Sequence, residues 1–181
     1  MDFVTLSRLN RANRTVIGEL DAMGFYDDAV QTVDVYLVPF GFAYGWQFYG
    51  TTGRINIPAI STSRLGHLFQ GGYTSLRDVL RHEYAHAIAD THRGLIRSRR
   101  FTDAFGANHT WDFEWEYDPH FHVSEYAATC PAEDFAEVFM FYLRHGGVMP
   151  QRIRTPSVSR KWAFIRRLAY AVSQGLRRWR E

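Results

Sequence analysis

The chain of 181 residues is 46% hydrophobic and 16% aromatic, which is typical of one globular domain over 1–181 with a sizeable core. Its formal net charge is only +2, and Lys161 is the one lysine among its 21 basic residues. Cys130 is the only cysteine, which excludes an intrachain disulfide and a cysteine-rich zinc site, so histidines and carboxylates must hold any metal.

The N-terminal residues show no secretion signal. Asp2 interrupts the first apolar residues, and no apolar run approaches the length of a signal core or a membrane span. We expect a soluble chain with no membrane span and no nucleic-acid partner. Its localisation stays open between the cytoplasm and export by a route not visible in the sequence, and its oligomeric state is unknown.

The first part of the chain predicts one helix followed by a small sheet. Over 5–23 apolar residues recur with a helical period, and Gly24 can end this helix. Three short apolar segments bounded by glycine or proline follow within 33–58, namely 33–37, 42–49 and 54–57. The tight connections between them predict a small, mostly antiparallel sheet.

The stretch from His82 to His86 has the pattern HExxH. On a helix of about 3.6 residues per turn, this spacing places both imidazoles on one face, where they can bind one Zn²⁺. Glu83 lies beside such a metal without binding it and can take a proton from a water whose pKa zinc lowers. Because HExxH also arises by chance, the pattern needs a third ligand.

The helix that carries this motif is expected over 75–93. Ser75 and Asp78 have the spacing of a capping box at its start, and Gly94 is the natural stop. The two histidines project to the side of the apolar stripe of this helix, which argues against a role in filling the core.

Two residues compete as the third ligand. His92 lies ten residues after His82, as in the extended metzincin pattern HExxHxxGxxH, but Ala89 stands where that pattern breaks the helix with glycine. If the helix continues, His92 points about 100° away from the other two histidines. Glu133 begins a second helix, expected over 131–145, and would complete a His₂Glu set with an open position for water.

Glu137 and Asp90 are candidates to orient the ligating histidines. Glu137 follows Glu133 by one turn on the same helix face and can accept a hydrogen bond from His82, and Asp90 follows His86 by one turn. Each is alternatively an ordinary acid on the surface of its helix.

The motif from His82 to His86, combined with SEYAATCPAEDFAE at 124–137, resembles the gluzincin peptidases related to the catalytic domain of anthrax lethal factor and to the clostridial Pro-Pro endopeptidases. The resemblance covers about 75–145 and implies a zincin-like α+β fold, in which the small sheet packs on the HExxH helix and on a second helix carrying the glutamate ligand. It also implies that Tyr126, seven residues before Glu133, stabilises the oxyanion.

The resemblance further implies a zinc endopeptidase with Glu83 as general base and then general acid. A peptide or protein would bind in extended form along an edge strand near Ile55 and Asn56. Two alternatives are a hydrolase of small peptides or other amides with the same site, and a non-catalytic zinc-bearing binding module. In the peptidase, one catalytic Zn²⁺ would be held by His82, His86 and Glu133.

Four further features each allow two interpretations. His120 and His122 either enter the cleft, where His122 would contact substrate, or are loop residues. The acids and aromatics of 111–118 either line a cleft or form an irregular, packed excursion. The basic amphipathic helix expected over 157–180 either contacts a membrane surface or nucleic acid or docks on its own domain. Cys130 either blocks the zinc as a thiolate or is a buried loop thiol.

Overall fold

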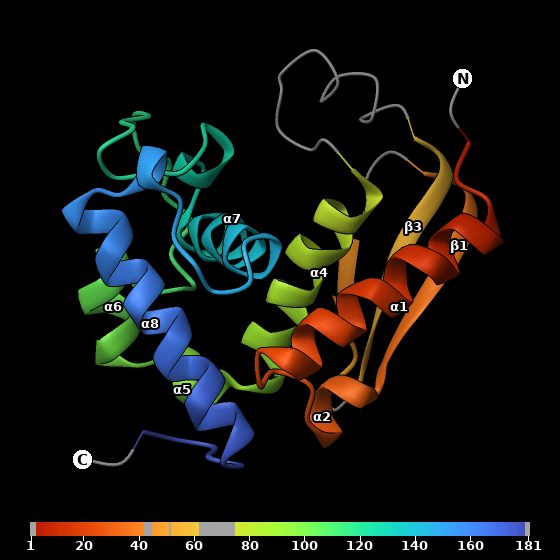
Figure 1. The fold of residues 1–181 in the computed structure, drawn as a ribbon, viewed down its shortest axis with the longest axis horizontal. Coiled ribbons are helices and arrows are strands. Elements are labelled where there is room, and N and C mark those ends of the chain that lie inside the picture. Colours follow the sequence, from red (N-terminus) through yellow and green to blue (C-terminus); the bar gives the residue numbers. More distant parts are fainter. Residues whose placement is uncertain (1–2, 42–44, 51, 62–74, 180–181) are drawn as a thin grey trace.

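The computed structural model describes residues 3–41, 45–50, 52–61 and 75–179 (Figure 1). Over these residues the protein is α+β, with seven α-helices and one three-stranded sheet. None of these helices is long and apolar enough to cross a membrane. The elements in chain order are α1 (Leu6–Ala22), α2 (Asp28–Gln31), β1 (Val33–Gly41), β2 (Gly45–Phe48), β3 (Gly53–Ser61), α4 (Leu76–Thr91), α5 (Arg93–Ile96), α6 (Arg99–Phe105), the 3₁₀ helix η1 (Tyr126–Ala128), α7 (Pro131–Arg144), the 3₁₀ helix η2 (Gln151–Ile153) and α8 (Pro156–Ser173).

Helix α4 is the central element of the molecule (Figure 1). The sheet and α1 pack on one side of it, and α7 packs on the other, with α6 and α8 covering the far side of α7 (Figure 1). One hydrophobic cluster runs through all these layers, and its fully buried members include Ile57 in β3, Tyr84 in α4 and Phe135 in α7. The Tyr84 hydroxyl donates a hydrogen bond of 3.0 Å to Asn13 in α1, which ties these two helices together.

The sheet is mixed, so the prediction of a mostly antiparallel sheet was wrong. Its strand order is β1-β3-β2, with β1 parallel to β3 and β2 antiparallel to β3. β3 lies between β1 and the short β2. β1 and β3 are therefore neighbours, and they run in the same direction. The sequence could not reveal this order, because the alternation of apolar residues specifies a strand's buried face and not its neighbours.

Both long strands continue through a proline that was expected to end them, Pro39 in β1 and Pro58 in β3. Proline lacks the N–H group that a strand with two paired edges needs. β1 is an edge strand, and β2 pairs with β3 only as far as Asn56, so neither proline interrupts a doubly paired segment. Of the strand expected over 42–49, positions 42–44 lie outside the described residues.

Two glycines allow close approaches of neighbouring groups, and one of them, Gly94, was expected to end a helix. Gly53 begins β3, and a Cβ there would lie 2.2 Å from Cη2 of Trp46. Gly94 lies inside α5, where a Cβ would lie 2.2 Å from the Arg177 carbonyl oxygen. Helix α4 instead ends two residues earlier than expected, with His92 as its C-cap.

Helix α8 docks on its own domain, and it is shorter than the predicted 157–180. Thr155 caps its N-terminus, and Gly175, with a φ of +65°, follows its C-terminus. Beyond the helix, the Trp179 indole donates a hydrogen bond of 2.7 Å to the Leu95 carbonyl oxygen. The buried apolar residues of α8 are Val158, Trp162, Phe164, Ile165, Leu168, Ala169, Ala171 and Val172.

Candidate metal centre

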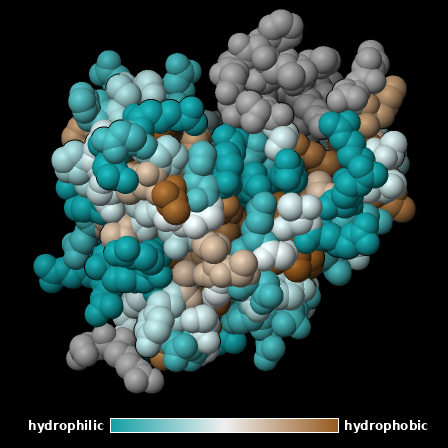
Figure 2. All heavy atoms as spheres, viewed as in Figure 1, coloured by the Kyte–Doolittle hydropathy of each residue, from teal (hydrophilic) through white to brown (hydrophobic). Residues whose placement is uncertain are grey.

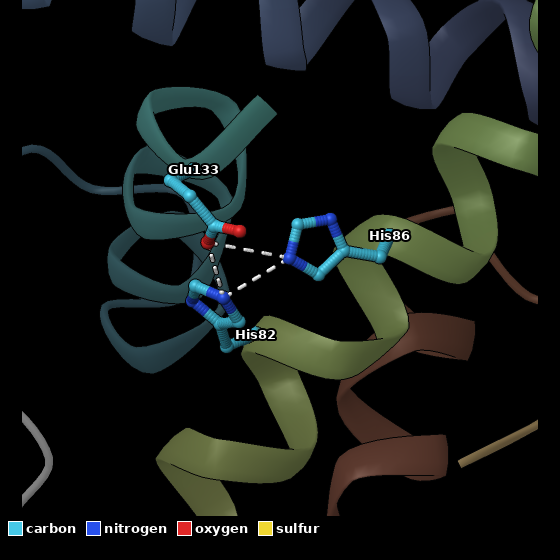
Figure 3. A group of neighbouring side chains, drawn as sticks. All are labelled: His82, His86 and Glu133. Atoms are coloured by element: carbon cyan, nitrogen blue, oxygen red, sulfur yellow. Dashed lines mark hydrogen bonds and ion pairs between the residues drawn. The ribbon is translucent and has the colours of Figure 1, made fainter. Parts of the chain in front are cut away.

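Helices α4 and α7 bring two imidazoles and one carboxylate to a single point (Figure 3). His82 and His86 project from successive turns of α4, and Glu133 projects from the first turn of α7, which begins with Pro131. Nε2 of His82 lies 2.9 Å from Glu133 Oε2, and Nε2 of His86 lies 3.4 Å from the same oxygen. The two Nε2 atoms are 3.1 Å apart.

These three separations fit a tetrahedral zinc ion. Zinc bonds of about 2.0–2.1 Å place any two ligand atoms of a tetrahedron about 3.3 Å apart. The three ligand atoms found here form a triangle with sides of 2.9, 3.1 and 3.4 Å. Within the described ranges, this is the group of histidine, cysteine and carboxylate side chains that could hold a metal.

The distribution of protons at the site also favours a cation. Nδ1 of His82 lies 3.0 Å from Glu137 Oε1, so Nδ1 is assigned the proton and Nε2 keeps a lone pair. Oε2 of Glu133 is buried, and its nearest described partners are the Nε2 atoms of the two histidines. In the neutral ring, a carboxylate oxygen and an imidazole lone pair would therefore face each other at 2.9 Å, an arrangement that a positive charge between them stabilises, whether a metal ion or a second proton on His82.

The pKa values of His82 and Glu133 reflect the attraction between the imidazoles and the carboxylates of the site. Burial lowers the pKa of His82, but hydrogen bonds to Glu133 and Glu137 outweigh burial and raise it to about 10. Burial raises the pKa of Glu133, but its interactions with His82 and His86 outweigh burial, and the pKa falls below its usual value. A proton on His82 thus supplies the positive charge when no metal does.

Glu137 is held by both of its carboxylate oxygens. It is 2% exposed, and Oε2 accepts a hydrogen bond of 2.6 Å from the Ser124 hydroxyl while Oε1 faces His82. Ser124 Oγ in turn accepts a hydrogen bond of 3.1 Å from the Ala127 N–H, at the start of η1. Sequence reasoning missed Ser124, although a serine three residues before the N–H that it caps is a recognisable local signal.

Glu83 lies beside the cluster and is 8% exposed. Burial raises the pKa of its carboxyl group, and the positive charges of His82 and His86 offset part of this increase. The backbone N–H of Trp46 in β2 donates a hydrogen bond to it. The result is a carboxylate that is oriented by a strand and more basic than one in water, which suits a general base.

Tyr126 begins η1 and faces the same cluster. Its ring centroid lies 5.7 Å from that of His82. Burial, followed by the nearby carboxylates of Glu133 and Glu83, raises the pKa of its hydroxyl, which therefore stays protonated and can donate a hydrogen bond. Cys130 caps α7 and is half-buried, and burial raises the pKa of its thiol, which disfavours a thiolate near neutral pH.

His92 lies away from the cluster. It is 2% exposed, its Nε2 lies 3.0 Å from Asp27 Oδ2, and its Nδ1 lies 3.0 Å from Thr91 Oγ1. Both ring nitrogens are therefore engaged where α4 meets α2. The structure groups Glu133, and not His92, with the two histidines of HExxH.

Asp90 does not orient a histidine, so this prediction was wrong. Its carboxylate accepts a hydrogen bond of 2.9 Å from the Trp46 indole and forms an ion pair of 3.1 Å with Arg93. The hydrogen bond from Trp46 links β2 to α4. The Asp90 carboxylate is occupied by its neighbours along and beside the helix, which the one-turn spacing from His86 could not reveal.

Ile55 and Asn56 do not lie on an edge strand, so that prediction was also wrong. β3 is the central strand, with β1 on one side of these residues and β2 on the other, and the Ile55 side chain is fully buried. The strand that borders the site is β2, whose Trp46 N–H reaches Glu83. The prediction failed because it assumed that β3 is an edge strand, whereas β3 is the central strand of the sheet.

His122 lies outside the metal cluster, and its contact with substrate stays a prediction. It is 8% exposed, and its ring packs on Trp115 and Tyr117 with centroid distances of 5.7 and 6.5 Å. His120 is exposed. The segment 111–118 is irregular and largely exposed rather than packed, and Trp115 ties it to η1 by an N–H bond of 2.8 Å to the Ala128 carbonyl.

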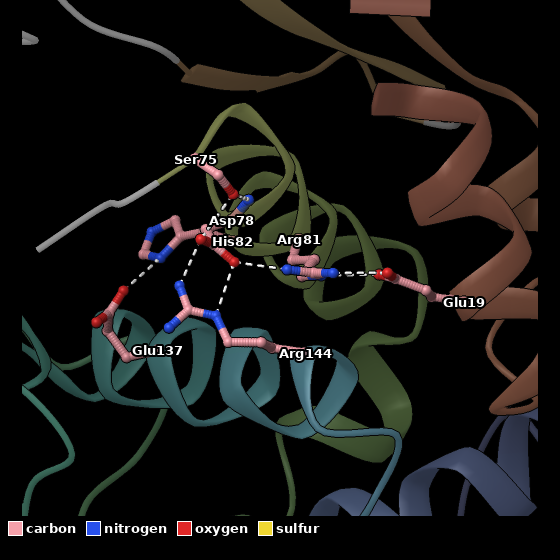
Figure 4. A network of polar contacts seen from close by, with 7 residues as sticks. All are labelled: Glu19, Ser75, Asp78, Arg81, His82, Glu137 and Arg144. Carbon is pink, nitrogen blue, oxygen red and sulfur yellow. Dashed lines mark hydrogen bonds and ion pairs between the residues drawn. The ribbon is translucent and has the colours of Figure 1, made fainter. Parts of the chain in front are cut away.

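A network of ion pairs behind the site fixes α4 against both of its helical neighbours (Figure 4). Asp78, at the start of α4, accepts hydrogen bonds of 2.6 Å from Arg81 and 2.9 Å from Arg144 in α7. Arg81 also forms a bidentate pair with Glu19 in α1, at 2.6 and 2.7 Å. Because Asp78 and Arg144 join the helices that carry the ligands, this network helps to set the separation of the ligands.

Comparison of the chain with family models, with curated proteins and with solved structures finds no match.

Proposed function

We propose that this protein is a zinc-dependent endopeptidase with a zincin-like arrangement of sheet, HExxH helix and glutamate-bearing helix. The observation that carries the proposal is the convergence of two Nε2 atoms and one carboxylate oxygen, at separations of 2.9–3.4 Å, beside a fourth side chain, Glu83, suited to act as a base. The residues that would hold the zinc are His82, His86 and Glu133.

Zinc, when bound, supplies a Lewis acid that polarises a carbonyl group and lowers the pKa of water toward neutrality. Glu137 keeps the His82 ring in the tautomer and orientation that present Nε2 to the metal. The side chains of His86 and Glu133 are 20% and 21% exposed. Solvent therefore reaches part of the cluster.

Two residues of the chain would carry the proton transfers and the charge. Glu83 takes a proton from the attacking water and passes it to the nitrogen of the leaving amine, which its raised pKa favours. Tyr126 donates its hydroxyl proton in a hydrogen bond to the oxyanion that forms as the carbonyl carbon becomes tetrahedral, a contact worth most in the transition state.

The position of β2 supports an extended peptide as the substrate. β2 pairs with β3 on one side, and on its other side the Trp46 N–H points to Glu83. A peptide added along this side would run past the general base in an extended form, with main-chain hydrogen bonds providing affinity. This position favours a substrate with several residues over a small amide.

The test measures bound zinc and peptide cleavage on the same samples. Wild-type protein should bind one zinc ion and cleave members of a peptide library. Glu83→Gln should keep the zinc and lose about 10²- to 10⁴-fold in the rate of cleavage, because it removes the base and no ligand. Glu114→Gln, which removes an exposed carboxylate outside the cluster, is the matched control and should leave both unchanged.

Zinc binding by the wild type with no cleavage of any peptide would support the non-catalytic zinc-bearing module instead. Cleavage of dipeptides and simple amides but not of longer peptides would favour the hydrolase of small substrates. Absence of zinc from protein prepared with zinc present would overturn the proposal altogether.

A further inference from the structure

The charges of the second half of the chain are strongly segregated along the sequence. Residues 107–137 contain no lysine or arginine, and 138–179 contain no aspartate or glutamate. The acids of the first segment are Asp112, Glu114, Glu116, Asp118, Glu125, Glu133, Asp134 and Glu137, and the bases of the second are Arg144, Arg152, Arg154, Arg160, Lys161, Arg166, Arg167, Arg177 and Arg178.

Folding gathers part of the basic segment on one surface. Because α8 buries its apolar face in its own domain, Arg160, Arg166 and Arg167 remain exposed on it. Figure 2 shows hydrophilic side chains gathered over this helix. α8 packs beside α6, so that Arg100 of α6 joins the same surface.

A groove between α6 and α8 has a volume of about 560 Å³ and is lined by Arg100, Arg160 and Arg167. Arg160 and Arg167 are seven residues apart on α8, which places them two turns apart on one face. Asp103 is the one acid in its lining. Guanidinium groups bind phosphate oxygens through paired N–H donors, so the groove suits a phosphate group.

An aromatic cavity of about 790 Å³ adjoins this groove, since Asp103, Ala104 and Arg160 line both. Its volume is within the range of pockets for small organic ligands. Its walls include Phe105, Trp115, Tyr117 and Phe121.

The aromatic cavity also has an unused hydrogen-bonding group. His122 lines it and is 8% exposed, and its Nδ1 is buried with no hydrogen-bond partner among the described residues. Lys161, also in the wall, is already engaged by Asp134 and the Phe121 carbonyl, each at 2.5 Å. The ligand that fits is therefore a planar group with polar edges.

Charge decides how a ligand would lie across the two spaces. Asp103 and Arg160 line both spaces. Glu116 and Asp118 line only the aromatic cavity, whose other base, Lys161, is paired with Asp134. A phosphate is therefore disfavoured in the cavity and favoured in the groove, while an uncharged ring with amino groups can donate to the carboxylates.

We propose that the aromatic cavity and the arginine groove together bind a nucleoside phosphate, with the base among the aromatic side chains and the phosphate against the arginines. The ligand is a free nucleotide or the end of a single-stranded nucleic acid, in which a charged groove and aromatic stacking surfaces also cooperate. This site differs from the sequence-based expectation of no nucleic-acid partner, because the arginine of α6 and the adjoining cavity become neighbours of α8 only in the fold. It is independent of the proposed peptidase site.

The test is calorimetric titration of the full chain with adenosine monophosphate, adenosine, inorganic phosphate and a short oligoadenylate at low ionic strength. Adenosine monophosphate should bind about ten-fold more tightly than adenosine or inorganic phosphate, because it occupies both spaces. Tighter binding of the oligoadenylate than of the nucleotide identifies a nucleic-acid end as the source, and weaker binding identifies the free nucleotide.

Variants separate the two halves of the site. Arg167→Ala should weaken binding of the monophosphate about five-fold and leave adenosine unaffected, because it removes one exposed phosphate contact. Tyr117→Ala should weaken both ligands that carry a base and leave inorganic phosphate unaffected. Arg14→Ala removes an exposed arginine from α1 and should change nothing.

Three results would overturn the proposal. The first is no binding of adenosine monophosphate at millimolar concentration. The second is equal affinity for the monophosphate and for polyglutamate, which would indicate a surface that binds any polyanion. The third is binding of the monophosphate that neither Arg167→Ala nor Tyr117→Ala weakens.

Discussion

Glu133 and Glu137, one turn apart on α7, face the two opposite nitrogens of the same imidazole. Oε2 of Glu133 lies 2.9 Å from His82 Nε2, and Oε1 of Glu137 lies 3.0 Å from Nδ1. Glu133, the proposed zinc ligand, and Glu137, which orients the second ligand His82, are therefore carried by the same helix. Any rotation of α7 would disturb both contacts together.

Glu137→Gln should weaken zinc binding about ten-fold or more, because the amide removes the negative charge that raises the basicity of His82. The measurement is zinc affinity by competition with a chromophoric chelator. Glu114→Gln serves as the matched control. Unchanged affinity in Glu137→Gln would show that its carboxylate does not support the metal.

Tyr126→Phe should lower kcat about 10²- to 10³-fold with little change in KM, because the hydroxyl contributes mainly to the transition state. Zinc content should stay at the wild-type value, since Tyr126 is not a ligand. The measurement is steady-state cleavage of a fluorogenic peptide selected from the library. A rise in KM with kcat unchanged would instead assign the hydroxyl to ground-state binding.

His92→Ala should keep the zinc but lower the free energy of unfolding by about 1–3 kcal/mol, because it leaves the part-buried Asp27 carboxylate without this partner. Glu133→Ala should lose the zinc. The two measurements are zinc stoichiometry and urea unfolding. Loss of zinc in His92→Ala and its retention in Glu133→Ala would restore the metzincin ligand set.

Asp78→Asn should lower the free energy of unfolding at pH 7 by about 3 kcal/mol, because two guanidinium groups lose a buried carboxylate. Burial raises the pKa of Asp78, but hydrogen bonds and charges from Arg144, Ser75 and Arg81 outweigh burial and lower it below its usual value of 3.8.

A carboxyl group with a depressed folded pKa contributes stability above its unfolded pKa and loses it as the pH falls through the folded value. The stability difference between wild type and Asp78→Asn should therefore be constant down to about pH 4 and shrink below it. Urea unfolding from pH 7 to pH 3 measures this difference, with Asp103→Asn as the exposed control. A difference that does not depend on pH would contradict the assigned role.

Local sequence signals predicted the elements that carry the site. The spacing of His82 and His86 determines that both face one side of α4, and Ser75 caps that helix as its spacing with Asp78 indicates. Pro131 begins α7 as expected of a proline in the first helical turn. The hypothesis that Glu133 lies near the histidines required the resemblance as well as helix periodicity, because 47 residues separate Glu133 from His86.

The errors concern contacts that depend on the arrangement of distant segments. The alternation of residues in β3 could not show that β1 and β2 would occupy both of its edges. The spacing of Asp90 from His86 could not show that the Trp46 indole, from a strand far away in the sequence, would take its carboxylate. Ser124 and Trp46 became site residues only when the fold placed them beside Glu137 and Glu83.

The origin of the ligands in two helices has a consequence for stability. A zinc ion bound there would cross-link α4 and α7, and it would bind the folded chain far better than the unfolded one. Folding and metal binding are then thermodynamically linked, and free zinc at 100 times its dissociation constant would add about 2.7 kcal/mol to the free energy of unfolding. The melting temperature of the protein would then serve as a gauge of free zinc, even for variants that no longer cleave a peptide.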